Sequence, residues 1–150
     1  MRVALDTNIL VNLTGIESKD VRDSTFDLLL KIPIENLLIP AQCLGEMYAV
    51  LTRKTSMPAK AVQETILSLA DAIDIAESAC PDFIEAIRIA SAHRLQLWDS
   101  LILAVSARSK CRILLSQDMQ HGFSCGGVTI VNPYKTPVHP LLREAMNEGR

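Results

Sequence analysis

Aromatic residues are scarce in this sequence, and their scarcity restricts the kind of core that the chain can build. Only 4% of the 150 residues are Phe, Trp or Tyr, whereas 49% are hydrophobic. Aliphatic side chains must therefore fill the interior, which suits a layered α/β fold with buried parallel strands. The length fits one domain, since domains of about 100–150 residues are the commonest.

A positive net charge is also missing. The 17 acidic residues outnumber the 15 Lys and Arg, and the formal net charge is -2 at pH 7. Domains that bind nucleic acid through their overall charge are usually basic. If this chain handles nucleic acid, its affinity must come from a local basic strip, from bound metal ions or from a partner.

Neither a disulfide framework nor a membrane segment is indicated. Cys43, Cys80, Cys111 and Cys125 are far apart and lack the paired spacing of metal ligands. Free thiols in a reducing cytoplasm are the simpler interpretation. The N-terminal segment reaches Asp6 too early for a signal peptide, and no run approaches the roughly 18 apolar residues of a membrane span. We therefore expect a cytoplasmic protein without membrane contact.

Short apolar runs alternate with longer amphipathic segments along the chain. The short runs predict strands at residues 3–5, 37–39, 73–75, 111–115 and 128–131. The longer segments predict helices at residues 7–13, 20–31, 41–54, 58–70, 82–93 and 98–109. Asp82 and Glu85 have the spacing of a capping box, with Asp82 as the expected N-cap. Strands that alternate with helices are typical of an α/β domain with a parallel sheet.

Two acidic residues follow predicted strands. Asp6 comes directly after the first strand, and Asp118 lies three residues beyond Leu115, where a later strand ends. In an open parallel sheet, ligands bind beyond the carboxyl ends of the strands. Both carboxylates are therefore candidates for a binding site at that edge of the sheet.

Two further acids lie on apolar faces of predicted helices. Glu46 shares its face with Cys43 and Val50, and Asp99 shares its face with Leu103. An unpaired buried carboxylate is costly, and several carboxylates in one crevice repel each other unless a cation is present or one stays protonated. Carboxylate oxygens suit Mg²⁺ or Mn²⁺, and such ions support hydrolysis of phosphate esters. The pattern therefore favours a metal site.

Each acid also has a simpler structural interpretation, and the residues alone leave these alternatives open. Asp6 could cap the helix that follows it. Asp99 could favour the first turn of its helix through the helix dipole. Asp118 could form an Asx turn, and Glu46 could pair with a buried Arg. It is the combination of two strand-end acids with two acids on apolar helix faces that favours the metal site.

A small basic cluster and the missing motifs narrow the other choices. Arg53, Lys54 and Lys60 stand near the end of the Glu46 helix, either as a solvated helix end or as a track for phosphate groups. No Gly-rich phosphate loop is present, nor is a G-x-S-x-G elbow. His121 is expected to be a polar turn residue.

Four segments, taken in order, resemble the PIN-domain family. They are the Asp-Thr-Asn sequence that begins at Asp6, Glu46 within residues 44–54, the L-W-D-S-L-I-L-A sequence at 97–104, and the L-L-S-Q-D-M-Q-H-G sequence at 114–122. The resemblance covers about residues 1–133. It implies a Rossmann-like α/β/α sandwich with a central, mainly parallel sheet.

The resemblance also implies a function and a set of site residues. The function is an Mg²⁺- or Mn²⁺-dependent endoribonuclease that hydrolyses RNA phosphodiester bonds. The residues that match the family's catalytic and metal-binding acids are Asp6, Glu46, Asp99 and Asp118. The residues that match supporting polar neighbours, which orient such acids by hydrogen bonds, are Thr7, Asn8 and Ser116. Arg53 and Lys54 are the candidates for substrate binding.

A PIN domain of this length looks most like a VapC-like toxin of a type II toxin–antitoxin pair. The resemblance then implies a homodimer, an RNA substrate and inhibition by a VapB-like antitoxin. The alternative is a PIN module that binds RNA or protein without catalysis. A phosphohydrolase of the haloacid-dehalogenase type is disfavoured, because its chemistry needs a second acid where this chain has Asn8.

Two features depart from the family's pattern. Pro40-Ala41 stands where a Ser or Thr often begins the third helix, so a side-chain N-cap is missing. We take residues 1–133 as the PIN domain and expect residues 134–150 to form a loosely packed C-terminal extension with at most one helical turn. Contact with a dimer partner or an antitoxin is one hypothesis for its role.

Overall fold

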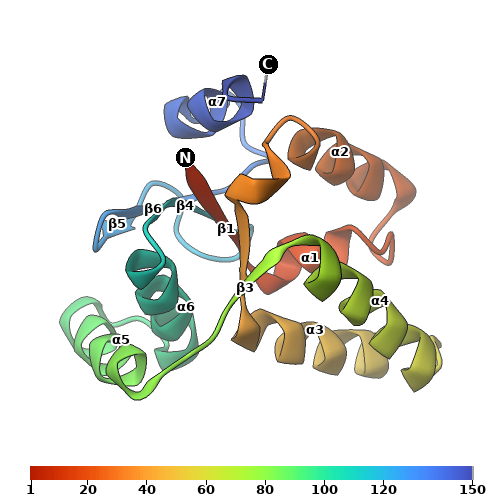
Figure 1. Cartoon of the computed structure of the whole chain (residues 1–150), viewed down its shortest axis with the longest axis horizontal. Helices are drawn as coiled ribbons and strands as arrows, with labels where there is room; N and C mark the ends of the chain where they lie inside the picture. The colour runs from red at the N-terminus through yellow and green to blue at the C-terminus, as the bar shows by residue number, and fades with distance from the viewer. Residues whose placement is uncertain (150) are drawn as a thin grey trace.

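One central sheet organises the chain in the computed structural model, which describes residues 1–149 (Figure 1). Its strands are β1 (Arg2–Leu5), β2 (Leu37–Pro40), β3 (Asp74–Ala76), β4 (Cys111–Leu115), β5 (Ser124–Cys125) and β6 (Val128–Val131). Their order across the sheet is β3-β2-β1-β4-β6-β5. All neighbours pair in parallel except β5 and β6. The expected α/β fold with a mainly parallel sheet is confirmed.

Helices cover both faces of this sheet. They are α1 (Thr7–Asn12), α2 (Lys19–Leu29), α3 (Ala41–Lys54), α4 (Ala59–Ala72), α5 (Cys80–His93), α6 (Leu97–Arg108) and α7 (Pro140–Asn147), with a short 3₁₀ helix, η1 (Ile34–Asn36). Figure 1 shows α1 to α4 on one side and α5 with α6 on the other. Right-handed crossovers require this division, because the chain moves outward from β1 to β3 and then returns across the sheet to β4. None of the helices in residues 1–149 is long and apolar enough to cross a membrane.

The centre of the sheet is built from aliphatic side chains alone. Val3, Ala4 and Leu5 of β1 have no exposed surface, and neither do Ile113 and Leu114 of β4. The middle of α6 is buried all round, because it lies between the sheet and α5. Buried strands need side chains that pack on both faces, so near-continuous Val, Ile and Leu replace the aromatic residues that the sequence lacks.

The strand order places a topological switch point between β1 and β4. From β1 the chain goes to β2 on one side, and it returns to β4 on the other side. The connections leave the ends of these two strands in opposite directions, so a crevice opens beyond their carboxyl ends. Helices α1 and α3 begin at this edge because they follow β1 and β2, and α6 also begins there because it leads back to the start of β4. The fold thus gathers two strand ends and three helix N-termini around one crevice.

One local expectation was wrong. Helix α5 begins at Cys80, so Asp82 lies in its first turn and is not the N-cap. The Asp82 carboxylate accepts a hydrogen bond from the Ala79 backbone N–H at 2.8 Å and pairs with Arg108 at 2.7 Å.

The short hairpin of β5 and β6 was not expected. Its two central residues are Gly126 and Gly127, with φ values of 59° and 82°, and the tight turn between hairpin strands favours glycine at such positions.

The C-terminal extension is more ordered than expected. Residues of α7 pack into the core, and Leu142 and Ala145 have no exposed surface. Glu148 pairs with the N-terminal ammonium of Met1 and accepts a hydrogen bond from Asn36 at 3.2 Å. Because these partners precede β1 and β2, α7 lies at the edge of the sheet where the parallel strands begin. The extension therefore contributes to the core at the edge opposite the crevice.

Leu142→Ala is expected to lower the free energy of unfolding by about 2–5 kcal/mol, the range for truncating a fully buried Leu. Urea denaturation of the variant and the wild type measures the difference. Leu141→Ala is the matched control, because Leu141 is only partly buried on the same helix. If both variants were as stable as the wild type, α7 would be only loosely attached.

Candidate functional site

Asp6 lies at the centre of the crevice and is held there by hydrogen bonds on both oxygens. Its Oδ1 accepts the Thr7 backbone N–H at 2.7 Å, and its Oδ2 accepts the Ser116 hydroxyl at 2.7 Å and the Asn8 amide at 3.0 Å. Only 5% of Asp6 is exposed. Its own N–H donates to the Leu115 carbonyl, which continues the β1–β4 pairing. Asp6 therefore caps α1, as the simpler interpretation proposed, and also faces the crevice.

Glu46 reaches the crevice from the second turn of α3. Its Oε2 accepts the Thr7 hydroxyl at 2.7 Å, and its Oε1 accepts the Gln42 amide at 2.5 Å. The same Gln42 amide donates to the Trp98 carbonyl at 3.2 Å, which ties α3 to the start of α6. No Arg or Lys pairs with Glu46 among residues 1–149, so the simpler alternative of a buried Arg partner does not hold there.

Asp118 and Asp99 complete the acidic group from the loop after β4 and the first turn of α6. The Asn8 amide donates to Asp118 Oδ2 at 3.3 Å as well as to Asp6, so one side chain links the two carboxylates. Asn8 also accepts the Gln117 backbone N–H through its own Oδ1 at 2.9 Å. The Ser116 hydroxyl accepts the Asp118 backbone N–H at 3.3 Å. The loop after β4 is therefore held by Asn8 of α1 and by Ser116 at the start of the loop itself.

All four acids line one pocket of about 540 Å³. The other polar residues of its lining are Thr7, Asn8, Asn12, Glu17, Arg53, Lys54 and Gln117. Ser116 has no exposed surface and supports the pocket from below. Lys60 lies in a separate groove beside α4, and the His121 imidazole accepts the Asn132 N–H away from the pocket. Sequence reasoning missed Asn12 and Gln117, although Asn12 stands one helical turn after Asn8 and so shares its face.

The electrostatics of the pocket reflect crowded carboxylates. Burial raises the pKa of Asp6 to about 6, assisted by the charges of Asp99 and Glu46 and opposed by hydrogen bonds from Ser116 and Thr7. Burial also raises the pKa of Asp99, together with the charges of Glu46 and Asp118. A nearby cation would favour the charged forms of these acids. Binding of a cation in the pocket would therefore stabilise the ionised carboxylates.

The family model described as the PIN domain matches residues 3–122 of the chain. The chain belongs to the PIN-domain family. Comparison with curated protein sequences gave no match, whereas several solved structures share the fold. A toxin–antitoxin complex from Klebsiella pneumoniae is 20% identical over 89% of this chain and 98% of the other chain, with a TM-score of 0.68. The resemblance expected from the four sequence segments is confirmed.

Two further solved structures carry the same fold. The sarcin–ricin loop cleaving toxin VapC20 from Mycobacterium tuberculosis is 17% identical and has a TM-score of 0.64, with 77% of this chain and 91% of the other covered. FitAcB from Neisseria gonorrhoeae is 17% identical and has a TM-score of 0.62, with 88% and 98% covered. This chain therefore spans nearly the whole length of its structural neighbours.

The donor set of this PIN domain fits a hard divalent cation. The four acids offer only oxygen donors, which Mg²⁺ and Mn²⁺ prefer. Among residues 1–149, no three acid, His or Cys side chains stand as a ready-made metal-binding group. Mg²⁺ is usually held by one or two carboxylates, with waters and substrate oxygens completing its shell. Asp6 and Asp118, whose carboxylates both accept from the Asn8 amide, are two of the acids that could hold such an ion.

Proposed function

We propose that this PIN domain is a metal-dependent endoribonuclease and a VapC-like toxin. PIN domains are generally nucleases that use divalent metal ions. The observation that carries the proposal is the convergence of Asp6, Glu46, Asp99 and Asp118 in one pocket, with the pKa of Asp6 raised to about 6. Burying like charges together is costly, and the cost is offset when the pocket binds a cation.

Each group in the pocket has a proposed part in hydrolysis. Mg²⁺ or Mn²⁺, when bound, would supply Lewis acidity and lower the pKa of a water molecule. Asp6 and Asp118 would hold the ion, and the Asn8 amide, which donates to both carboxylates, would fix their separation. Glu46 is oriented by Thr7 and Gln42, and we assign it with Asp99 to binding and orienting the attacking water. Water as the nucleophile leaves the 2′-hydroxyl uninvolved.

The basic end of the pocket supports a nucleic acid substrate. Arg53 and Lys54 stand in the last turn of α3 and line the same pocket as the acids. The Arg53 side chain donates through Nε to the Ala49 carbonyl at 3.2 Å, which leaves its terminal nitrogens to bind a phosphate. This local strip provides the positive charge that the whole chain lacks. RNA is the proposed substrate, because the neighbour VapC20 is described as cleaving the sarcin–ricin loop.

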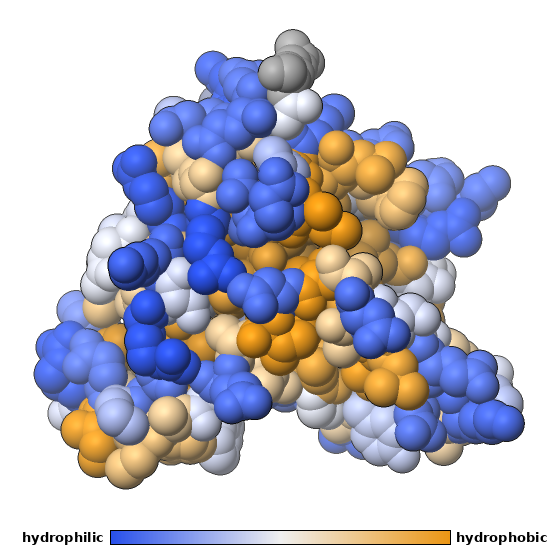
Figure 2. Space-filling model, viewed as in Figure 1, coloured by the Kyte–Doolittle hydropathy of each residue, from blue (hydrophilic) through white to orange (hydrophobic). Residues whose placement is uncertain are grey.

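An exposed apolar groove supports a protein partner. Its most exposed large hydrophobic members are Phe26, Leu30 and Ile34, which are 55%, 67% and 56% exposed. They line a groove of about 600 Å³ with residues of α4 and β2. Figure 2 shows hydrophobic residues gathered over the region that lies between α2 and α4 in Figure 1. Large exposed apolar patches mark interaction sites.

We assign this groove to a VapB-like antitoxin, because the Klebsiella pneumoniae neighbour is a toxin–antitoxin complex. A homodimer in the cytoplasm, with antitoxin bound to each copy, completes the proposal.

The test is cleavage of a set of single-stranded and hairpin RNAs, with matched DNA, by the antitoxin-free protein. We expect cutting of RNA with Mg²⁺ or Mn²⁺, none with EDTA, and no 2′,3′-cyclic phosphate among the products. Cyclic phosphate ends, or equal cutting in EDTA, would contradict the mechanism. No cutting by folded protein across the RNA set would favour the non-catalytic binding module.

A further inference from the structure

Tyr134 lies beyond the part of the chain that the family model matches, yet its hydroxyl group is hydrogen-bonded to Asn12, which lines the pocket. The Asn12 amide donates to the Tyr134 hydroxyl at 2.8 Å and to Gln117 Oε1 at 3.1 Å. Asn12 and Gln117 both line the pocket, and Asn12 is only 3% exposed. We propose that Tyr134 is a positioning residue that fixes the loop carrying Asp118, an inference that rests on the proposed function.

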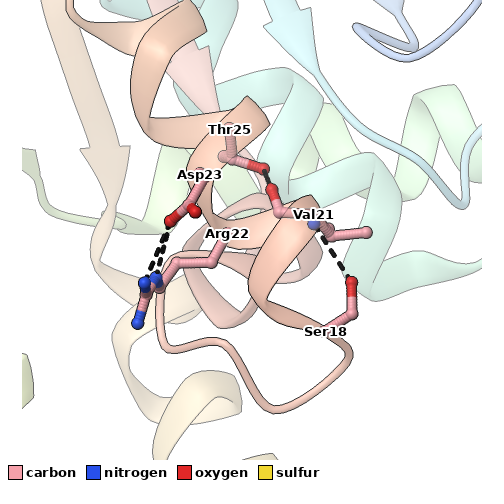
Figure 3. Close-up of polar contacts among 5 residues, drawn as sticks. All are labelled: Ser18, Val21, Arg22, Asp23 and Thr25. Atoms are coloured by element: carbon pink, nitrogen blue, oxygen red, sulfur yellow. Dashed lines mark hydrogen bonds and ion pairs between the residues drawn. The ribbon is translucent and has the colours of Figure 1, made fainter.

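The direction of the bonds around the Tyr134 hydroxyl follows from counting protons. The Thr25 hydroxyl donates its one proton to the Val21 carbonyl at 2.6 Å, as Figure 3 shows. The 2.7 Å contact between the Thr25 and Tyr134 hydroxyls must then use the tyrosine proton. Tyr134 therefore donates to Thr25 and accepts from Asn12. One phenol oxygen joins the end of α1 to the middle of α2 by a continuous chain of hydrogen bonds.

The backbone around Tyr134 is held in turn. The Tyr134 N–H donates to Asn132 Oδ1 at 2.9 Å, and the Asn132 N–H donates to the His121 imidazole at 3.0 Å. The phenol group thus enters the core from a segment that is anchored to the β4–β5 connection. This anchoring holds the backbone from which the Tyr134 hydroxyl reaches Asn12.

From Asn12 the chain of contacts leads to the carboxylates. Asn12 holds the Gln117 side chain, and the Gln117 backbone N–H donates to Asn8 Oδ1. That bond fixes Asn8 so that its amide can donate to both Asp6 and Asp118. Without the Tyr134 oxygen, the buried Asn12 amide has one unpaired proton and must turn to find another acceptor, because a buried donor rarely stays unpaired. Gln117 then loses the hydrogen bond from Asn12. The loop that carries Asp118 is held less firmly as a result.

The first test measures backbone amide exchange in Tyr134→Phe without metal or RNA. We expect the amides of residues 117–119, which the Asn8 and Ser116 side chains hold, to exchange about tenfold faster than in the wild type. Tyr48→Phe is the matched control, because Tyr48 is 45% exposed on α3 and the phenylalanine change is identical. Thermal unfolding of both variants reports on global stability.

The second measurement is the kinetics of RNA cleavage by the same variants. We expect kcat of Tyr134→Phe to fall about tenfold, the lower end of the effect of outer-shell residues. KM should stay unchanged, because Arg53 and Lys54 are outside the chain of contacts, and Tyr48→Phe should match the wild type. Unchanged exchange at residues 117–119, or faster exchange with unchanged kcat, overturns the inference. A wild type that cuts no RNA overturns the proposed function instead, since exchange is measured without substrate.

Discussion

Asp6→Asn is expected to lose RNA cleavage and to make the metal-free protein more stable at pH 8. Residues that only orient the ligands of a metal commonly contribute 10–100-fold to activity, so removing a carboxylate that we propose as a ligand itself should cost more than about 100-fold. The gain in stability follows from burial, because the pKa of Asp6 is raised to about 6 from 3.8. A raised carboxyl pKa means that the folded state binds the proton more tightly than the unfolded chain does.

The sign of the pH effect is therefore fixed. The stabilising effect of protonated Asp6 is fully present below about pH 4 and is lost as the pH rises through about 6. Two pKa units correspond to about 3 kcal/mol. The gain in stability from Asp6→Asn is smaller than this, because the amide turns an NH₂ group toward a hydrogen-bond donor. We expect Asp6→Asn to exceed the wild type by about 1–2 kcal/mol at pH 8, and this advantage to vanish near pH 4.

Urea denaturation in EDTA at pH 4 and pH 8 measures this difference. Asp71→Asn is the matched control, because Asp71 is exposed on α4 and lies outside the pocket. The account would be wrong if Asp6→Asn were less stable than the wild type at pH 8, or if it cleaved RNA at the wild-type rate.

Mn²⁺ is expected to stabilise the wild type and to leave Asp6→Asn unaffected. An ion that binds only the folded state raises the free energy of unfolding by about 2.7 kcal/mol at a concentration of 100 times its Kd. The effect should weaken as the pH falls through about 6, where Asp6 takes up a proton and can no longer bind the ion. The stability of the metal-free protein changes in the opposite direction, because it falls as the pH rises and Asp6 ionises.

Unfolding curves with and without Mn²⁺, at pH 5 and pH 8, test this reversal. The same curves for Asp71→Asn correct for weak binding of Mn²⁺ to surface carboxylates. An equal Mn²⁺ shift in the wild type and in Asp6→Asn would place the ion outside this pocket.

The convergence of the four acids could be predicted because it follows from topology. Asp6 and Asp118 follow parallel strands, and the carboxyl ends of parallel strands share one edge of a sheet. Glu46 and Asp99 lie near the N-termini of helices that begin at the same edge. Their apolar surroundings marked both as unusual, and the structure places them in the same pocket.

Other features were beyond the sequence because local signals competed with tertiary contacts. Asp82 is a residue type that is favoured at N-caps, but Pro81 suits the first turn of a helix. The helix therefore starts earlier, and Asp82 pairs with Arg108. The order of the C-terminal extension depends on Leu142, which is buried in a core whose other members are distant in the sequence. The contact of Tyr134 with Asn12 joins residues that are 122 positions apart. No local sequence pattern predicts such a contact.

The most direct measurement compares the rates of RNA cleavage by the wild type and by Asp99→Asn at saturating Mg²⁺. Asp99 suits this test because its pKa is shifted by burial and by neighbouring charges without a contribution from hydrogen bonds, so an amide of the same shape disturbs the fold least. Asp71→Asn serves as the control. We predict that Asp99→Asn stays folded and cuts at less than about one-hundredth of the wild-type rate. Cleavage by Asp99→Asn at the wild-type rate would contradict a catalytic role for the acidic pocket.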